Sequence, residues 1–320
     1  MEIIISIVSF IAGIALVLYG ADALVKGASA LARKFNISEL VIGLTIVALG
    51  TSLPELVISV GSAIKGSSGI ALGNIIGSNI FNAMFILGVT AMITPIKFSA
   101  KMLSRELPFN LLASIVLILI SGSMLIGGAD NEEITRYGGL ILLCFLAVFI
   151  RYTFSITNDG DSTDEKIEEV TGWKILFYIV AGLATLIFGG KLFVSGATDI
   201  ARMLGLSEAV IGITIVSAGS SLPELAVSVN AARKGNASIA LGNVLGSNIL
   251  NIFFILGCSA TITPISLNGF SFVDYYVLIA ASLMVYAVSK FGGKNVINRW
   301  EGALLTLGYI AYTVYLITSC

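Results

Sequence analysis

Two glutamates stand in the middle of long apolar segments, each at the end of nearly the same six-residue sequence. The first copy is Gly50-Thr51-Ser52-Leu53-Pro54-Glu55, and the second, 169 residues later, is Gly219-Ser220-Ser221-Leu222-Pro223-Glu224. A carboxylate at the centre of a bilayer costs at least about 2.5 kcal/mol, so it persists where it is paired, protonated or bound to an ion. These two side chains are therefore the first candidates for function.

The residue types around the two glutamates favour a hard cation. Proline lacks an N–H and clashes with the carbonyl one turn earlier, so Pro54 and Pro223 are expected to interrupt their helices and free backbone oxygens. Carboxylate, carbonyl and hydroxyl oxygens suit Ca²⁺, Na⁺ or K⁺, and the chain has no histidine for a softer metal. The alternative interpretation is a packed proline kink whose carbonyls are satisfied by Ser and Thr hydroxyls. Two copies, each followed by a glutamate, favour the ion site.

Composition indicates an integral membrane protein, because 57% of the 320 residues are hydrophobic and 12% are charged. Apolar runs of about 20 residues match the length of a membrane-spanning helix and are too long for the alternating strands of a barrel. The first run is expected to be a retained span rather than a signal peptide. The sequence thus predicts an all-helical protein with ten spans, near residues 3–20, 39–64, 70–92, 107–127, 135–155, 173–195, 208–232, 239–263, 272–290 and 299–318.

The distribution of basic residues predicts the orientation in the membrane. Fourteen of the 18 Lys and Arg residues fall in the loops that follow odd-numbered spans, and four fall in the other set. Since basic residues mark the cytoplasmic side, both termini are expected to be extracellular. Residues 156–172 then form an acidic cytoplasmic linker, with cytoplasmic cation sensing as the alternative role of its carboxylates.

An internal repeat divides the chain into two halves. Gly43–Val60 and Gly212–Val229 agree at 12 of 18 positions, and Ile70–Asn82 and Ile239–Asn251 agree at 10 of 13. Each half holds five predicted spans, an odd number, so the second half must be inverted relative to the first. Inverted repeats with interrupted helices indicate a secondary transporter whose site lies near the midplane. The predicted divisions are residues 1–155, the linker at 156–172, and residues 173–320, with the repeated motifs at about 39–92 and 208–263.

The paired Gly-Thr/Ser-Ser-Leu-Pro-Glu and Gly-Asn-x-x-Gly-Ser-Asn-x-x-Asn blocks resemble the two alpha-repeats of the cation/calcium exchanger superfamily, specifically its Na⁺/Ca²⁺ exchangers of the prokaryotic type without a large regulatory loop. The resemblance implies a transporter and not an enzyme. It implies antiport of several Na⁺, typically three, against one Ca²⁺ by alternating access, with spans 1 and 6 sliding across a core of spans 2, 3, 7 and 8. Na⁺ and Ca²⁺ would be cargo in the cell membrane, with no cofactor, nucleic acid or obligatory protein partner.

The resemblance also implies roles for individual residues. Glu55 and Glu224 would bind both ions, and Thr51 and Ser220 would lend oxygens to Ca²⁺. The two inner Na⁺ sites would consist of Ala48, Ser52, Glu55 and Ser247, and of Ser217, Ser220, Ser221, Glu224 and Ser78. Asn82 and Asn251 would flank the central position. Potassium-dependent relatives carry an acid at the position of Asn251, so its neutral amide counts against K⁺ co-transport.

Several other functions remain open from the sequence. H⁺/Ca²⁺ exchange and K⁺-dependent Na⁺/Ca²⁺ exchange would use the same carboxylates, and a cation channel could use the same oxygen ligands. An intramembrane enzyme would need a nucleophile with a base, and without histidine no suitable pair is found. A protein with a purely structural repeat would tolerate replacement of Glu55 and Glu224 by glutamine.

Overall fold

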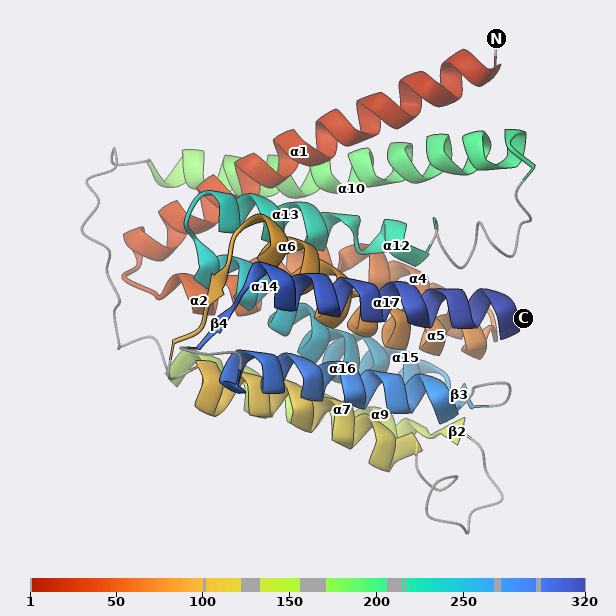
Figure 1. The fold of residues 1–320 in the computed structure, drawn as a ribbon. Coiled ribbons are helices and arrows are strands. Elements are labelled where there is room, and N and C mark those ends of the chain that lie inside the picture. Colours follow the sequence, from red (N-terminus) through yellow and green to blue (C-terminus); the bar gives the residue numbers. More distant parts are fainter. Residues whose placement is uncertain are drawn as a thin grey trace.

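The computed structural model describes residues 2–99, 102–121, 133–155, 171–205, 215, 217–267, 272–291 and 295–319. Two long helices, α1 (Glu2–Lys34) and α10 (Gly172–Met203), lie side by side along one side of the molecule (Figure 1). At 1.5 Å per residue α1 is about 50 Å long, well beyond the roughly 30 Å of a hydrocarbon core. The predicted first run stops near residue 20, whereas the helix continues to Lys34.

The close approach of α1 and α10 depends on glycine at every seventh position of both helices. A Cβ atom at any of these glycines would collide with backbone or side-chain atoms of the partner helix, and their order shows that the two helices run antiparallel. A seven-residue period keeps one face of each helix against the other along their length. The glycines are Gly13, Gly20 and Gly27 on α1 and Gly182, Gly189 and Gly196 on α10.

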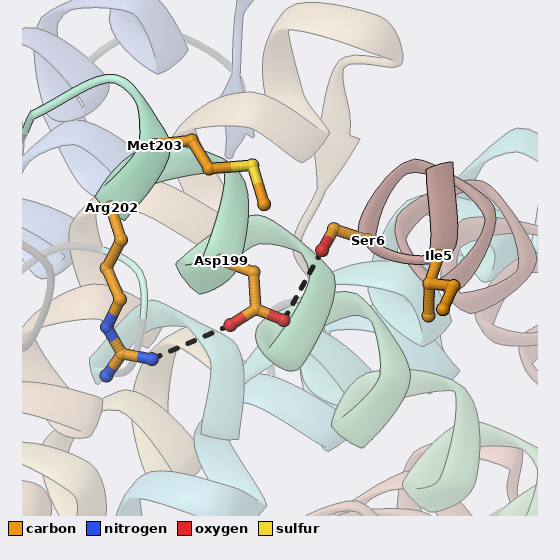
Figure 2. Close-up of a pocket in the computed structure, with 5 residues that line it drawn as sticks. All are labelled: Ile5, Ser6, Asp199, Arg202 and Met203. Carbon is orange, nitrogen blue, oxygen red and sulfur yellow. Dashed lines mark hydrogen bonds and ion pairs between the residues drawn. The ribbon is translucent and has the colours of Figure 1, made fainter. Parts of the chain in front are cut away.

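One end of the α1–α10 pair carries a small polar cluster above a hollow of about 310 Å³ (Figure 2). Asp199 of α10 accepts a hydrogen bond from Ser6 Oγ of α1 at 3.5 Å and forms an ion pair with Arg202 at 3.6 Å. The bond from Ser6 joins α1 to α10 at the end opposite Lys34, whereas the ion pair lies within α10.

The interrupted helices of the repeated motifs lie between this pair and the helices α7, α9 and α16 on the far side (Figure 1). In the first half they are α2 (Glu39–Ile42), η1 (Gly43–Val47), α3 (Ala48–Thr51), α4 (Leu53–Ile64), α5 (Ser68–Ile80), η2 (Phe81–Ile86) and α6 (Leu87–Ile93). In the second half they are α12 (Ser217–Ser220), α13 (Leu222–Arg233), α14 (Ala237–Leu250), η5 (Asn251–Leu256) and α15 (Gly257–Ile262). The remaining helices are η3 (Met102–Glu106), α7 (Leu107–Ser121), α9 (Arg136–Ser155), α16 (Phe272–Phe291) and α17 (Arg299–Ser319).

The described residues contain eight helices long and apolar enough to cross a membrane, or nine when the bent pair Glu39–Thr51 and Leu53–Ile64 is taken as one span. The all-helical, multi-pass class predicted from composition is confirmed. Nine of the ten predicted runs coincide with these helices. The tenth, 208–232, lies partly outside the described residues, so the count of ten stays a prediction.

Two short antiparallel strand pairs connect the halves of the chain. β1 (Ile96–Lys97) pairs with β4 (Val296–Ile297), so that Ile96 faces Ile297, and β2 (Glu133–Ile134) pairs with β3 (Ile265–Ser266), so that Ile134 faces Ile265. The pairs lie at opposite ends of the molecule (Figure 1). Loops from both halves are therefore joined at each end.

Candidate cation-binding site

Both repeated motifs break their helices at the serine before Leu-Pro-Glu. Ser52 has φ −84° and ψ 10°, and Ser221 has φ −91° and ψ 12°. Each proline then occupies the first turn of the next helix, where its missing N–H costs nothing. The two helices around Ser52 differ in direction by 50°. The expected interruption is thus present in both halves, two residues beyond Gly50 and Gly219.

The two breaks face each other through a pair of crossed hydrogen bonds. Ser52 Oγ donates to Glu224 Oε1 at 2.9 Å, and Ser221 Oγ donates to Glu55 Oε1 at 2.8 Å. Both carboxylates are only 1% exposed. In the described residues the ion pairs involve Asp22 and Asp199, and neither glutamate has a basic partner there. Each buried carboxyl group thus accepts a hydrogen bond from a neutral donor of the opposite half.

Other predicted residues surround this pair. Ser78 shares a hydrogen bond of 3.1 Å with Ser221, and Ser247 Oγ lies 3.5 Å from Glu224 Oε1. Ala48 is buried, and its carbonyl accepts from Ser52 N at 3.0 Å. Ser217 begins α12, but its side chain lies outside the described residues.

Thr51 and Ser220 contact two asparagines for which the sequence predicted no role. Thr51 Oγ1 donates to Asn243 Oδ1 at 3.0 Å, and Ser220 Oγ donates to Asn74 Oδ1 at 3.4 Å. Each of these bonds crosses from one half of the chain to the other. A donating hydroxyl keeps its oxygen lone pairs, so both oxygens can still face an ion.

Each of the two asparagines also holds the backbone of a glutamate. Asn243 Nδ2 donates to the Glu224 carbonyl at 3.2 Å and to Ser228 Oγ at 3.0 Å. Asn74 makes the matching bonds to the Glu55 carbonyl at 3.3 Å and to Ser59 Oγ at 2.9 Å. The sequence feature that could have identified these two asparagines is the Gly-Asn pair that begins the second motif in both halves, inside an apolar span.

Five carboxylate and amide oxygens in this region are buried without a hydrogen-bond partner among the described residues. Burying a polar atom unpaired costs about 1–3 kcal/mol, so five in one region are expected to bind water or an ion. Oxygen atoms of this kind match the ligand preference of Na⁺ and Ca²⁺. The atoms are Glu55 Oε2, Glu224 Oε2, Asn82 Oδ1, Asn248 Oδ1 and Asn251 Oδ1.

The last asparagine of each second motif lies where its helix widens. The π-helical turn η2 contains Asn82, and η5 begins at Asn251. Asn251 Nδ2 donates to Asn79 Oδ1 at 3.0 Å, and Asn79 Nδ2 donates to the Asn248 carbonyl at 3.2 Å. π-Turns often occur at functional sites. The bonds between Asn79, Asn248 and Asn251 join the two halves and show that these asparagines lie at the same level in the bundle.

Known proteins resemble this chain over nearly its whole length. The sodium/calcium exchanger protein family matches residues 5–155 and 174–318. Sodium/calcium exchanger MaX1 of Methanosarcina acetivorans is 37% identical over 339 residues, covering 95% of this chain and 96% of that protein. Inner membrane protein YrbG of Escherichia coli is 34% identical over 317 residues, covering 96% and 95%. A solved structure of the sodium-calcium exchanger NCX_Mj, soaked with 10 mM Na⁺ and zero Ca²⁺, matches with a TM-score of 0.83 at 33% identity, covering 97% of this chain and 98% of that one.

Proposed function

Because the chain belongs to the sodium/calcium exchanger family, a family of membrane transporters and not of enzymes, we propose that it is a secondary active antiporter that exchanges Na⁺ for Ca²⁺. The crossed bonds between Ser52 and Glu224 and between Ser221 and Glu55 carry this proposal. They bring two carboxylates together in the centre of the bundle and leave one oxygen of each without a partner in the part of the chain that the structure describes.

The charge of this site accounts for competition between the two ions. Two ionised carboxylates are neutralised by one Ca²⁺ or by two Na⁺, so either cargo can replace the other at little electrostatic cost. The hydroxyls of Ser52 and Ser221 now donate to the carboxylates, and by rotating they can turn lone pairs toward an ion. A third Na⁺ would leave the loaded site with a positive charge. Exchange of three Na⁺ for one Ca²⁺ would then be electrogenic.

The proposed architecture is ten spans in two inverted five-helix repeats, residues 1–155 and 173–320, joined by a cytoplasmic linker at 156–172, with both termini extracellular. The paired contacts support it. The bonds of Asn74 reappear at Asn243, and the strand pair β1–β4 has its counterpart in β2–β3. Contacts that occur twice in this way are expected of repeats related by a pseudo-twofold axis in the membrane plane.

Alternating access would come from movement of α1 and α10 past the broken helices. A Cβ at Gly50 would collide with Leu183, and a Cβ at Gly219 would collide with Val194, both on α10. Apolar side chains of α10 thus cover the two helix breaks at different positions along the axis of α10. A shift of α10 along its axis would uncover one break while the other stays covered, which is the property that exchange without leakage requires.

The test is uptake of ⁴⁵Ca²⁺ by proteoliposomes loaded with Na⁺, compared with equal K⁺ loading and with an imposed pH gradient. Uptake that needs the outward Na⁺ gradient supports the proposal. Uptake driven by the pH gradient would instead identify H⁺/Ca²⁺ exchange, a further requirement for K⁺ would identify the potassium-dependent type, and uptake without any counter-ion would identify a channel. Glu39→Gln, at the start of α2, serves as a matched control for loss of an acid outside the site.

A further inference from the structure

A groove of about 590 Å³ runs between α1, α6 and α13, apart from the carboxylate pair. Its walls are mostly apolar, and Leu18 and Ile93 on its sides are exposed. In a membrane the groove therefore opens sideways toward lipid. Its apolar lining consists of Ile14, Val17, Leu18, Val89, Ile93, Phe193, Leu222, Leu225, Ala226 and Val229.

One end of the groove is cationic. Asp22 and Lys234 line this end and form an ion pair with each other, and Lys26 also contacts Asp22 at 2.8 Å. Arg233 lines the same end, is exposed, and forms no ion pair with another described residue. Two lysines thus contact a single carboxylate, and Arg233 adds a further positive charge at the same end of the apolar channel.

The length of the groove matches one leaflet of a bilayer. From Arg233 to Leu222 along α13 the chain rises about 16 Å at 1.5 Å per residue. Half of a hydrocarbon core of roughly 30 Å is about 15 Å. Leu222 is separated from Glu224 only by Pro223, so the groove spans the distance between the charged border of the bundle and the level of the site. An acyl chain covers the same distance from its headgroup to the midplane.

We propose that this groove binds an anionic phospholipid, with the phosphate at Arg233 and one acyl chain along α13 toward Leu222. The guanidinium matches a phosphate because its N–H groups can donate two parallel bonds. Asn230, which also lines this end, adds a neutral donor. The apolar walls explain why a lipid, rather than a free anion, is the occupant.

Native mass spectrometry of the purified full-length protein tests the site. The protein is titrated with phosphatidylglycerol or with phosphatidylcholine of identical acyl chains. We expect one phosphatidylglycerol to bind about fivefold more tightly, the preference that one interfacial cation provides. Arg233→Gln should remove that preference. Arg33→Gln, an exposed arginine at the end of α1, should retain it.

A second pair of variants tests the acyl-chain channel. Ala226→Phe fills the groove and should weaken binding of both lipids at least fivefold, whereas Ala311→Phe on the exposed face of α17 should change neither. Equal affinity for the two lipids, an unchanged preference in Arg233→Gln, or unchanged binding in a folded Ala226→Phe would each overturn the proposal. Displacement of the lipid by soluble glycerophosphoglycerol would also overturn it, because it would show an anion site without a chain channel. None of these measurements uses ion flux, so their failure leaves the exchange proposal standing.

Discussion

Ser52, in the first half of the chain, donates a hydrogen bond to a carboxylate oxygen of Glu224 in the second half at 2.9 Å. Ser221, in the second half, donates the matching bond to Glu55 in the first. Each glutamate is thus oriented by the helix break of the opposite half. Neither half would form the proposed ion site alone, since the serine and the carboxylate of each bond belong to different halves.

Replacement of either glutamate by glutamine should abolish Ca²⁺ flux. Glu55→Gln and Glu224→Gln keep the size of the side chain and its hydrogen bond from serine but remove the charge that balances the cation. We expect ⁴⁵Ca²⁺ uptake to fall to background while size-exclusion chromatography shows a folded protein. Uptake at the wild-type rate in either variant would contradict the assignment of the site.

Removal of the crossed donors should weaken ion binding less severely. Ser52→Ala takes a neutral donor from Glu224, and a hydrogen bond to a charged group contributes about 1.5–3 kcal/mol. The KM for Ca²⁺ should therefore rise roughly tenfold or more, with little change in melting temperature. Ser67→Ala, just before α5 and away from both glutamates, is the control and should leave the KM unchanged.

Asn243 is expected to contribute to stability as well as to ion binding. It is fully buried and makes three side-chain hydrogen bonds, to Thr51, Ser228 and the Glu224 carbonyl. At about 1 kcal/mol each, Asn243→Ala should lower the free energy of unfolding by about 3 kcal/mol. Chemical unfolding in detergent measures this loss. A variant as stable as the wild type would show that the three bonds are replaced by water or by rearranged side chains.

Asn251→Asp should change the ion preference of transport. The substitution places a third acidic group beside Asn79, at the level of the two glutamates in the proposed site. We expect Ca²⁺ uptake by this variant to respond to K⁺, Na⁺ and Ca²⁺ in proportions different from the wild type. Identical selectivity before and after the substitution would remove Asn251 from the site.

The glycine-lined contact between α1 and α10, called the glycine seam below, can be tested with a control substitution at the neighbouring residue. A Cβ at Gly189 would collide with Leu16, Val17 and the carbonyl of Gly13, whereas a Cβ at Gly190 meets nothing within 4 Å. Gly189→Ala should therefore force the two helices apart, lower the melting temperature and slow exchange. Gly190→Ala should do neither, and equal effects of the two substitutions would contradict a tight glycine seam.

Hydropathy predicted where the chain crosses the membrane but not where each helix ends. The predicted end of the first run, near Tyr19, marks the point where the chain becomes more polar. The helix continues because Ala and Leu favour it and because Asp22 and Lys26 form an ion pair one turn apart. The change in polarity near Tyr19 thus does not mark the end of this helix.

The repeated motif predicted the serines and glutamates that meet in the centre, but it did not predict their support. Asn74 and Asn243 were visible as polar residues in apolar spans. Their bonds to the Glu55 and Glu224 carbonyls depend on how neighbouring helices pack, which residue spacing along one helix does not specify. The ion pair of Asp22 with Lys234 is another contact of this long-range kind.

The pairing of β1 with β4 has a consequence for how the protein is made. Ile96 emerges early in synthesis, but its partner Ile297 lies close to the end of the 320-residue chain. Contacts between residues so distant in sequence form late, because nearly all of the intervening chain must be present first. The early spans must therefore wait in the membrane, with the Glu55 carboxylate lacking its donor Ser221, until the later spans have been inserted.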